Sequence, residues 1–400
     1  MHIAGVVAEY NPFHNGHALH LEKTRAKNGG CEATHIVAVM SGSFVQRGEP
    51  AILPKFDRAR MALLGGADLV LELPVPWCLS SAEGFAFGAV SMLESLRCVD
   101  SLSFGSESGE LAPLQKAVSL MDTPRYSSLL KYFMELGISF PEAQQKALAE
   151  IAGATAASVL DTPNNTLGIE YLKALERLGS RMAPFTVKRQ GSAHDSLAPI
   201  GNIASASYLR TLLSADRLIN ALPYIPAPSA AALSDAAQNG RVPASAERLE
   251  RAVLSRLRLL SVEDWQKVPG ISEGLENRAY NAVRTARSLA ELEEGIKTKR
   301  YPLTRVRRLV WSAYLGIPTG YAATCPPYIR VLAANERGKE ILSAAKPTVP
   351  LLYRASQVSK MSEECQALWE LENRATDLYN VAFPEPLPCG TDCTNGLVRE

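Results

Sequence analysis

The sequence lacks the long apolar segments that insertion into a membrane requires. Although 46% of its 400 residues are hydrophobic, no run reaches the roughly 18 uninterrupted apolar residues of a membrane-spanning helix. The N-terminus also lacks the basic and apolar blocks of a signal peptide, since residues 3–7 lead directly into a polar motif. The seven cysteines are scattered and odd in number. Together these features predict a cytoplasmic protein with reduced thiols and no membrane association.

The chain also lacks a net charge of either sign. Its 42 Lys and Arg residues against 41 Asp and Glu residues leave a formal charge of +1. The overall charge therefore gives no argument for a nucleic-acid partner, and such an argument must come from local clusters. The large apolar fraction excludes wholesale disorder. Because the length exceeds that of a usual single domain, we expect two domains.

Short apolar segments typical of buried strands dominate the first half of the chain. The early ones alternate with segments of helical spacing, which predicts an α/β fold with a parallel sheet covered by helices on both faces. Residues 108–160 contain no strand candidate and are predicted to form a helical insertion. The predicted strands are residues 3–8, 34–40, 68–73, 98–104 and 183–188.

The composition changes near residue 222, which we expect to end the first domain. Prolines punctuate an Ala- and Ser-rich stretch over residues 223–246, a composition typical of a linker. Residues 247–400 are predicted to form a mainly α-helical domain. The expected helices are residues 245–260, 275–294, 303–315, 327–345 and 355–372. Near the end, Cys389 and Cys393 make only half of a zinc site, so we predict no resident metal.

The most informative motif follows the first predicted strand. There, the run from Asn11 to His17 reads Asn-Pro-Phe-His-Asn-Gly-His. Ligands of parallel sheets bind where a strand passes into the next helix, and the N-terminus of that helix attracts phosphate. His14 and His17 can both donate hydrogen bonds to one phosphate group, and Gly16 allows its close approach. Two histidines that merely capped a helix would need no buried strand before them, so we predict catalytic roles.

Other polar segments follow later strands and are expected to line the same cleft. Residues 41–51 follow the second strand, and Lys55 and Arg58 begin the next helix, where they could contact phosphate or RNA or simply face solvent. Residues 188–194 follow the fifth strand. A helix start at residues 204–210 combines serines with an arginine and predicts a second anion site. The candidate phosphate or substrate contacts are Gln46, Arg47, Lys55, Ser205, Ser207 and Arg210.

The embedded run Val7–His17 resembles the His-x-Gly-His signature of the nucleotidyltransferase superfamily. Over most of residues 1–215 the chain resembles, more narrowly, the tRNA(Met) cytidine acetate ligase family. The segments that carry this resemblance are Val7–His20, Ser41–Ala51, Gly66–Pro74, Phe104–Glu107, Asn164–Tyr171 and Ser205–Arg210. The resemblance implies a Rossmann-like nucleotidyltransferase domain over residues 1–222.

The activity implied by this resemblance has two steps. ATP activates acetate as acetyl-adenylate with release of pyrophosphate, and the acetyl group then passes to the exocyclic amine of the wobble cytidine of elongator tRNA(Met). Magnesium is expected with ATP, held mostly by the phosphates because no carboxylate cluster marks a site. The family's ATP site corresponds here to Val7, Ala8, Glu9, Tyr10, Asn11, Pro12, Phe13, His14, Asn15, Gly16, His17, Ala18, Leu19, His20, Gly105, Asn164 and Arg189.

A local basic cluster in the second half is the expected tRNA contact. Its twelve residues, 297–308, contain no acid, and a tyrosine lies among the cations. Such clusters position RNA through its phosphates, although a solvated helix face remains the alternative. The cluster consists of Lys297, Lys299, Arg300, Arg305, Arg307 and Arg308.

Three other functions fit parts of the sequence. A ligase similar to citrate lyase ligase would acetylate a protein thiol but has no need of a basic helical domain. A dinucleotide-forming adenylyltransferase would leave residues 222–400 unexplained. A catalytically inactive RNA-binding scaffold would have no use for His14, Gly16 and His17.

Overall fold

A mixed sheet forms the centre of the computed structural model, which describes residues 1–27, 29–189, 199–272 and 274–400. Its strand order is β10-β8-β5-β2-β1-β6-β7, with β9 beside β8. The strands β5, β2, β1, β6 and β7 run parallel, which confirms the predicted α/β class. All five predicted strands are present, as β1 (Ile3–Ala8), β2 (His35–Ser41), β5 (Leu69–Leu73), β6 (Ser101–Ser106) and β7 (Ala183–Lys188).

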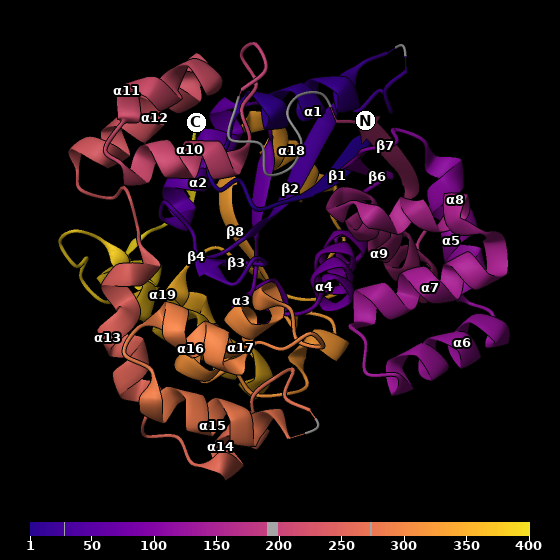
Figure 1. The fold of residues 1–400 in the computed structure, drawn as a ribbon. Coiled ribbons are helices and arrows are strands. Elements are labelled where there is room, and N and C mark those ends of the chain that lie inside the picture. Colours follow the sequence, from indigo (N-terminus) through magenta and orange to yellow (C-terminus); the bar gives the residue numbers. More distant parts are fainter. Residues whose placement is uncertain (28, 190–198, 273) are drawn as a thin grey trace.

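Strand β2 shows why this sheet must be covered on both sides. Val37 and Val39 belong to one hydrophobic core, whereas Ile36 and Ala38 belong to another. Successive side chains of a strand point to opposite faces, so these two cores lie on either side of the sheet. Helices cover both faces (Figure 1). Those packed on the first face include α4 (Ala82–Ser95) and α9 (Pro163–Arg177), and those on the second include α1 (Asn15–Arg25) and α2 (Lys55–Leu64).

The helix expected over residues 327–345 is wrong in its first part. Ile329–Ala334 forms the buried strand β8, antiparallel to β5, and only Glu336–Ala344 is helical, as α18. A short apolar run has no periodicity that separates a buried strand from a buried helix, so pairing with β5 decides. Figure 1 shows β8, in the colour of the second half, among the strands of the first half. The strands β9 (Leu351–Leu352) and β10 (Val398–Arg399) extend this edge.

The stretch predicted as a linker, residues 223–246, is not loosely structured throughout, because it contains the helix α12 (Ala227–Gln238). Its buried residues include Ala232 and Leu233, and Ser229 Oγ donates a hydrogen bond to the Met61 carbonyl of α2 at 2.7 Å. Alanine is the strongest helix former, and proline is well tolerated in the first turn. The composition that resembled a linker therefore also suits a helix packed on α2.

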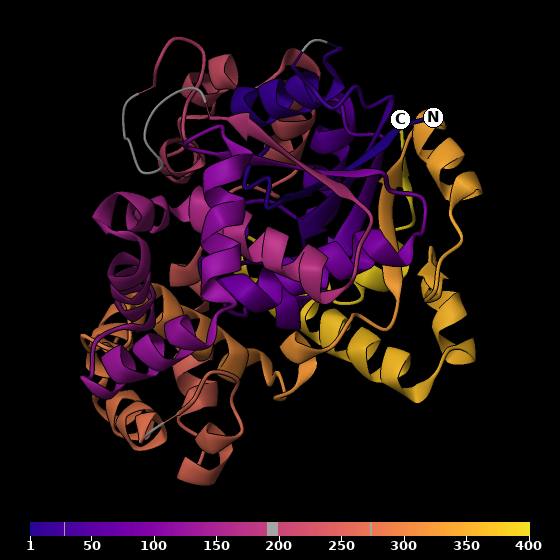
Figure 2. The same ribbon diagram turned by 90° about the vertical axis from the view of Figure 1, so that its right-hand side faces the viewer.

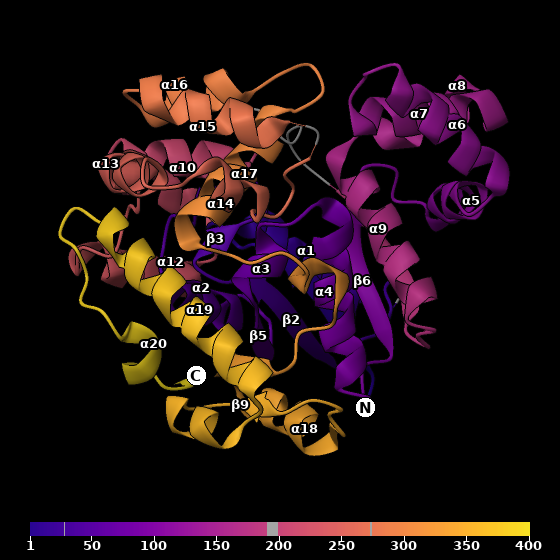
Figure 3. The same ribbon diagram turned by 90° about the horizontal axis from the view of Figure 1, so that it is seen from below.

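The predicted helical insertion is confirmed and projects away from the sheet (Figure 3). It contains α5 (Leu111–Met121), α6 (Pro124–Glu135), α7 (Phe140–Ala152) and α8 (Ala154–Ala157). The second half is mostly helical, and Figure 2 shows its helices along one side of the sheet. They include α13 (Ala246–Leu257), α14 (Val262–Gln266), α15 (Leu275–Thr285), α16 (Leu289–Ile296), α17 (Leu303–Leu315) and α19 (Glu363–Tyr379). Shorter elements are α3 (Val75–Cys78), α10 (Ala206–Ser214), α11 (Leu218–Ala221), α20 (Thr391–Thr394), and the hairpin of β3 (Phe44–Val45) and β4 (Glu49–Pro50).

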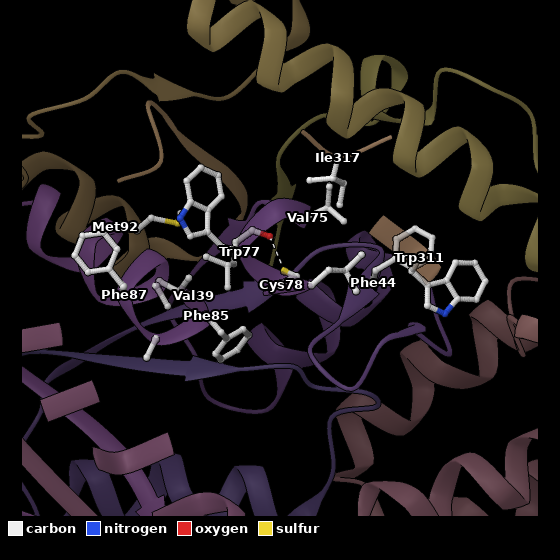
Figure 4. Close-up of a cluster of buried hydrophobic side chains, with 14 of the residues drawn as sticks. Val39, Phe44, Val75, Trp77, Cys78, Phe85, Phe87, Met92, Trp311 and Ile317 are labelled. Atoms are coloured by element: carbon white, nitrogen blue, oxygen red, sulfur yellow. Dashed lines mark hydrogen bonds between the residues drawn. The ribbon is translucent and has the colours of Figure 1, made fainter. Parts of the chain in front are cut away.

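Aromatic packing joins the second half to the loops at the carboxyl edge of the sheet. The ring of Phe44 in β3 lies 5.3 Å from that of Trp311 in α17 and 6.0 Å from that of Tyr379 in α19. Nearby, the Cys78 thiol donates to the Leu73 carbonyl at 3.1 Å, the contact drawn in Figure 4. These side chains belong to one continuous core, so the hairpin is held by helices distant in the sequence.

A buried ionic cluster ties the same regions together. Lys55 Nζ of α2 lies 2.6 Å from the Glu72 carboxylate of β5 and 2.8 Å from the Asp392 carboxylate of α20. Arg330 of β8 lies 3.2 Å from Glu72 and 3.1 Å from Asp392. All four side chains are buried, so each charge depends on the others for compensation. Burial, followed by the charge of Glu72, raises the pKa of nearby Glu372 to about 8.

Within the described ranges, no helix is long and apolar enough to cross a membrane.

We predict that Lys55→Met lowers the free energy of unfolding by about 3–5 kcal/mol, because it leaves buried carboxylates undercompensated. The matched control is Arg60→Met on the same helix. Arg60 forms an exposed pair with Glu400 at 2.5 Å, and such pairs contribute about 0–1 kcal/mol. Urea denaturation of both variants measures the difference. Equal stability losses would mean that the cluster contributes no more than a surface pair.

Candidate active site

The histidine motif forms the turn between β1 and α1. His14 is the N-cap of α1, and its Nδ1 accepts a hydrogen bond from the Gly16 N–H at 3.0 Å. His17 Nδ1 accepts in turn from the His14 N–H at 3.3 Å. The two imidazoles stack with their centroids 3.8 Å apart. The main chain therefore orients both rings before any ligand arrives.

These hydrogen bonds determine which nitrogen carries the proton. An Nδ1 that accepts must be unprotonated, so each neutral ring carries its proton on Nε2 and can donate it. Burial, followed by the charges of Arg189 and Arg210, lowers the pKa of His14 to about 3. Burial also lowers the pKa of His17 well below its usual value, with His14 and Arg189 contributing. At neutral pH the pair therefore offers two uncharged N–H donors.

Gly16 is required by His14 itself. A Cβ at residue 16 would lie 2.8 Å from His14 Cε1 and 3.0 Å from Nδ1, closer than side-chain atoms pack. The sequence predicts glycine here for the approach of a nucleotide, which stays a prediction. The structure adds a reason of its own: any side chain would displace the imidazole that caps α1.

Arginines from three separate elements converge on this turn. Arg210 of α10 donates to the Asn11 carbonyl at 3.0 Å and to Ser207 Oγ at 3.3 Å. Arg47 of the β3–β4 loop donates to the same hydroxyl at 3.4 Å. Arg189, which directly follows β7, acts on His14 through its charge. The structure thus brings together the candidates Arg47, Ser207 and Arg210 around the histidines. Ser205 caps α10 by accepting from the Tyr208 N–H at 3.1 Å.

A second wall of the cleft lies at the ends of β6 and β7. Arg189 Nη1 donates to Asn164 Oδ1 at 3.0 Å, and a Cβ at Gly105 would lie 3.4 Å from Arg189 Cγ. The structure therefore places Gly105, Asn164 and Arg189 together, as the resemblance implies. Glu107, absent from the predicted site, organises this wall: its carboxylate accepts from Asn164 Nδ2 at 2.6 Å and from the Asn165 N–H at 2.9 Å.

The position of Glu107 at the end of a strand was the signal that could have identified it. Burial alone would raise the pKa of Glu107, but the hydrogen bonds that it accepts lower it overall. Of the predicted run 188–194, residues 190–194 lie outside the described part of the chain.

The β3–β4 loop connects the motif to α17. The Gln46 N–H donates to Glu9 Oε1 at 2.7 Å, and the Gln46 carbonyl accepts from Arg308 Nη1 at 3.3 Å. Gly48 has a positive φ of 75°, and a Cβ there would lie 2.7 Å from the main-chain nitrogen of Arg308. Gln46 therefore contributes to the cleft through its main chain, and α17 packs directly on this loop.

The proposed phosphate contacts of Lys55 and Arg58 are wrong. Lys55 is buried in the ionic cluster described above. The Arg58 guanidinium is buried as well and donates to the carbonyls of Glu9 at 2.7 Å, Ser41 at 3.0 Å and Gly42. A sequence shows cations at a helix start but not which carboxylates or carbonyls will face them. Arg58 thereby holds the main chain after β1 and β2 in place.

The basic cluster at residues 297–308 is partly neutralised by the fold. Lys297 pairs with Glu294 and Arg307 with Glu293, each at 3.0 Å. Arg308 faces the β3–β4 loop, and its burial, followed by the charge of Arg305, lowers its pKa to about 10. Lys299 is exposed to solvent. The cluster therefore lies beside the cleft, and its contact with RNA stays a prediction.

Metal ligands are sparse in the part of the chain that the structure describes. No group there of three or more His, Cys, Asp or Glu side chains could hold an ion. Cys389 and Cys393 are exposed, and Cys393 Sγ lies 3.7 Å from Asn373 Oδ1. The described residues thus supply no protein cage for magnesium.

Comparison with known proteins agrees with this geometry. A model of the HIGH Nucleotidyl Transferase family matches residues 1–389. The tRNA(Met) cytidine acetate ligase of Thermoanaerobacter sp. (strain X514) is 39% identical, and that of Acetivibrio thermocellus 38%, each over 100% of both chains.

Solved structures of Thermotoga maritima TmcAL are also similar along their whole length. The apo form I is 33% identical with a TM-score of 0.93, and the form bound with alpha-thio ATP is 32% identical with a TM-score of 0.92; each comparison covers 100% of both chains. The family resemblance and the fold predicted from the sequence are therefore confirmed. The chain belongs to the HIGH nucleotidyl transferase family and, within it, to the tRNA(Met) cytidine acetate ligases.

Proposed function

We propose that this protein activates acetate with ATP and transfers the acetyl group to the exocyclic amine of the wobble cytidine of elongator tRNA(Met), forming N4-acetylcytidine. One observation carries the proposal: two neutral imidazoles present Nε2–H donors at a helix N-terminus that Arg47, Arg189 and Arg210 surround. Relatives that match the whole chain bear the name of this activity, and one solved relative binds an ATP analogue.

In the first step an acetate oxygen attacks the α-phosphorus of ATP, and pyrophosphate leaves. Negative charge grows on the α-phosphate oxygens, where His14 and His17 donate hydrogen bonds from positions already set by the main chain. The arginines balance the charge of the departing pyrophosphate. Because the donors are neutral and preorganised, this chemistry requires no proton transfer from the histidines.

The other predicted ATP-site residues lie next to His14 and His17. We place the adenosine along the wall of Gly105, Asn164 and Arg189, where the glycine lets a flat ring approach the backbone. The remaining expected ATP contacts surround the β1–α1 turn. Magnesium would come with the triphosphate and be held mainly by its phosphate oxygens, because the described residues offer no cage of protein ligands.

We further propose that the basic cluster holds the tRNA backbone beside the cleft. Lys299 is exposed, and Arg305 lies over the ring of Tyr301 with its guanidinium carbon 4.7 Å from the ring centre. Exposed cations of this kind are suited to phosphates, whereas the ring of Tyr301 is buried and supports Arg305 from below. The two alternative activities are acetylation of a protein thiol and formation of a dinucleotide. Neither gives a role to a basic helix that packs on the active-site loop.

We predict that His14→Ala or His17→Ala lowers ATP-dependent labelling of tRNA from carbon-labelled acetate by about 10²–10³-fold, the usual effect of losing a transition-state donor. Lys339→Ala, an exposed side chain on α18, is the control. Acetyl-adenylate without labelled tRNA would move the acceptor to a protein thiol. Absence of any adenylate in the wild type would eliminate acetate as substrate and favour dinucleotide formation.

The neutral state of His14 also predicts how stability depends on pH. The folded protein holds the pKa of His14 at about 3, whereas the unfolded chain has the ordinary value near 6.5. Between these values the unfolded state binds the extra proton, so stability is present above pH 6.5 and falls as the pH falls. His14→Asn keeps an N-cap acceptor and should flatten this fall by at most about 1.4 kcal/mol per pH unit. Urea denaturation at several pH values measures the slopes, and equal slopes would disprove a neutral His14.

For the RNA contact we predict that Lys299→Glu weakens tRNA binding and reduces its dependence on salt, with little change in acetyl-adenylate formation. Each lost phosphate contact lowers the slope of log affinity against log salt by about 0.7–0.9. Lys339→Glu gives the same change of charge on α18, which Figure 3 shows on the opposite side of the molecule from α16. Equal effects of both variants would mean that only net charge matters and that this cluster does not bind RNA.

A further inference from the structure

Glu9 lies between the histidine motif and the basic helix α17. It follows the last residue of β1, the edge of the sheet where ligands bind. Its Oε1 accepts from the Gln46 N–H at 2.7 Å, and the carbonyl of the same residue accepts from Arg308 at 3.3 Å. One residue of the β3–β4 loop therefore separates this carboxylate from the helix that carries the predicted RNA contacts.

The second oxygen of Glu9 is open. Among the residues that the structure describes, Oε2 has no hydrogen-bond partner, and Glu9 as a whole residue is partly exposed. The carboxylate is thus anchored through one oxygen and can use the other. The charged and titratable groups around Glu9 come from several elements: Arg47 and Glu49 of the hairpin, Arg58 of α2, Tyr171 of α9 and Arg210 of α10.

Among the described residues, several other candidate bases near the motif already have partners. His14 and His17 use their Nδ1 lone pairs to accept main-chain N–H groups, so no lone pair remains on the protonated Nε2. His20 Nε2 lies 3.0 Å from Ser103 Oγ. Glu49 Oε1 is buried and pairs with Arg210 at 3.3 Å, where the guanidinium compensates the charge of the carboxylate. Glu107 accepts hydrogen bonds through both of its oxygens. Glu9 therefore combines an oxygen anchored by Gln46 with one that has no partner among the described residues, beside the place where RNA is expected to arrive.

We propose that Glu9 is the general base of acetyl transfer, an assignment that rests on the proposed function. The cytidine N4 lone pair attacks the acetyl carbon of acetyl-adenylate, and a C–N bond forms. The bond from that carbon to the phosphate oxygen breaks, and AMP leaves with the electron pair. The N4 proton passes to Glu9 Oε2. The cytosine ring is then left with a neutral N4-acetyl amide.

The chemistry of the acceptor explains why a base is needed. An exocyclic amine becomes positively charged as its C–N bond forms, and it must lose a proton before the product is stable. Burial, the largest influence, raises the pKa of Glu9, although the Gln46 hydrogen bond opposes it. A carboxylate with a raised pKa is a better proton acceptor near neutral pH than an ordinary one.

The variant Glu9→Gln tests this role because glutamine keeps an oxygen to accept the Gln46 N–H. Acetyl-adenylate formation is followed by pyrophosphate exchange, and transfer by a single turnover of enzyme-bound labelled adenylate with tRNA. We expect the transfer rate to fall by about 10²-fold or more, and by at least about 10-fold more than adenylate formation, which loses only what Glu9 contributes as an expected ATP contact. The wild-type transfer rate should rise with pH as Glu9 loses its proton, and this limb should be absent in the variant.

Glu49→Gln removes a neighbouring charge and serves as the matched control, in which both steps should change by similar factors. Equal losses of both steps in Glu9→Gln would assign Glu9 to loop positioning and overturn the proposal. Unimpaired transfer in Glu9→Gln would mean that the phosphate of the adenylate, and not Glu9, accepts the N4 proton. If Glu49→Gln also loses transfer selectively, the loss comes from removing a negative charge near the cleft and not from a proton-accepting role of Glu9. If wild-type adenylate never acetylates tRNA, the proposed function fails and this assignment fails with it.

Discussion

The buried cluster of Lys55, Glu72, Arg330 and Asp392 is the constraint on which the arrangement of the molecule depends. Removing charges from water is costly, and the cost is recovered only if every partner is in place. Because the partners come from α2, β5, β8 and α20, the cluster requires both halves of the chain to meet at one edge of the sheet. A Cβ at Gly42 would lie 2.5 Å from Glu72 Oε1, so the loop that leads into the β3–β4 hairpin rests directly on the cluster.

The cleft next to this buried cluster combines permanent cations with uncharged histidines. The cations are the guanidinium groups of Arg47, Arg189 and Arg210. Burial, followed by the charges of Arg189 and Arg210, lowers the pKa of His14 and keeps it neutral. The positive potential needed for a triphosphate therefore comes from guanidinium groups, while the imidazoles serve as short-range donors. This division explains how two histidines can stack at 3.8 Å without repelling each other.

The hairpin connects this cleft to the second half of the chain. Its loop touches α17 through Gln46 and Gly48, and Phe44 at its base packs on Trp311. A ligand held by the basic cluster would consequently lie against the same loop that anchors Glu9. Activation and transfer would then share one rigid framework, in which the acceptor approaches the carboxylate next to the histidine motif.

The sequence by itself determined what depends on local order. Strand β1 followed by the His14 to His17 turn could be predicted because strand, turn and helix start are contiguous, and Gly105, Asn164 and Arg189 could be carried over from the family. Tertiary structure decided what depends on partners distant in the chain. The run 329–334 became a strand because it pairs with β5, and Lys55 became structural because Glu72 and Asp392 surround it. It likewise decided that one Glu9 oxygen accepts from Gln46 while the other has no partner among the described residues, because hydrogen-bond partners meet in space and are not set by sequence.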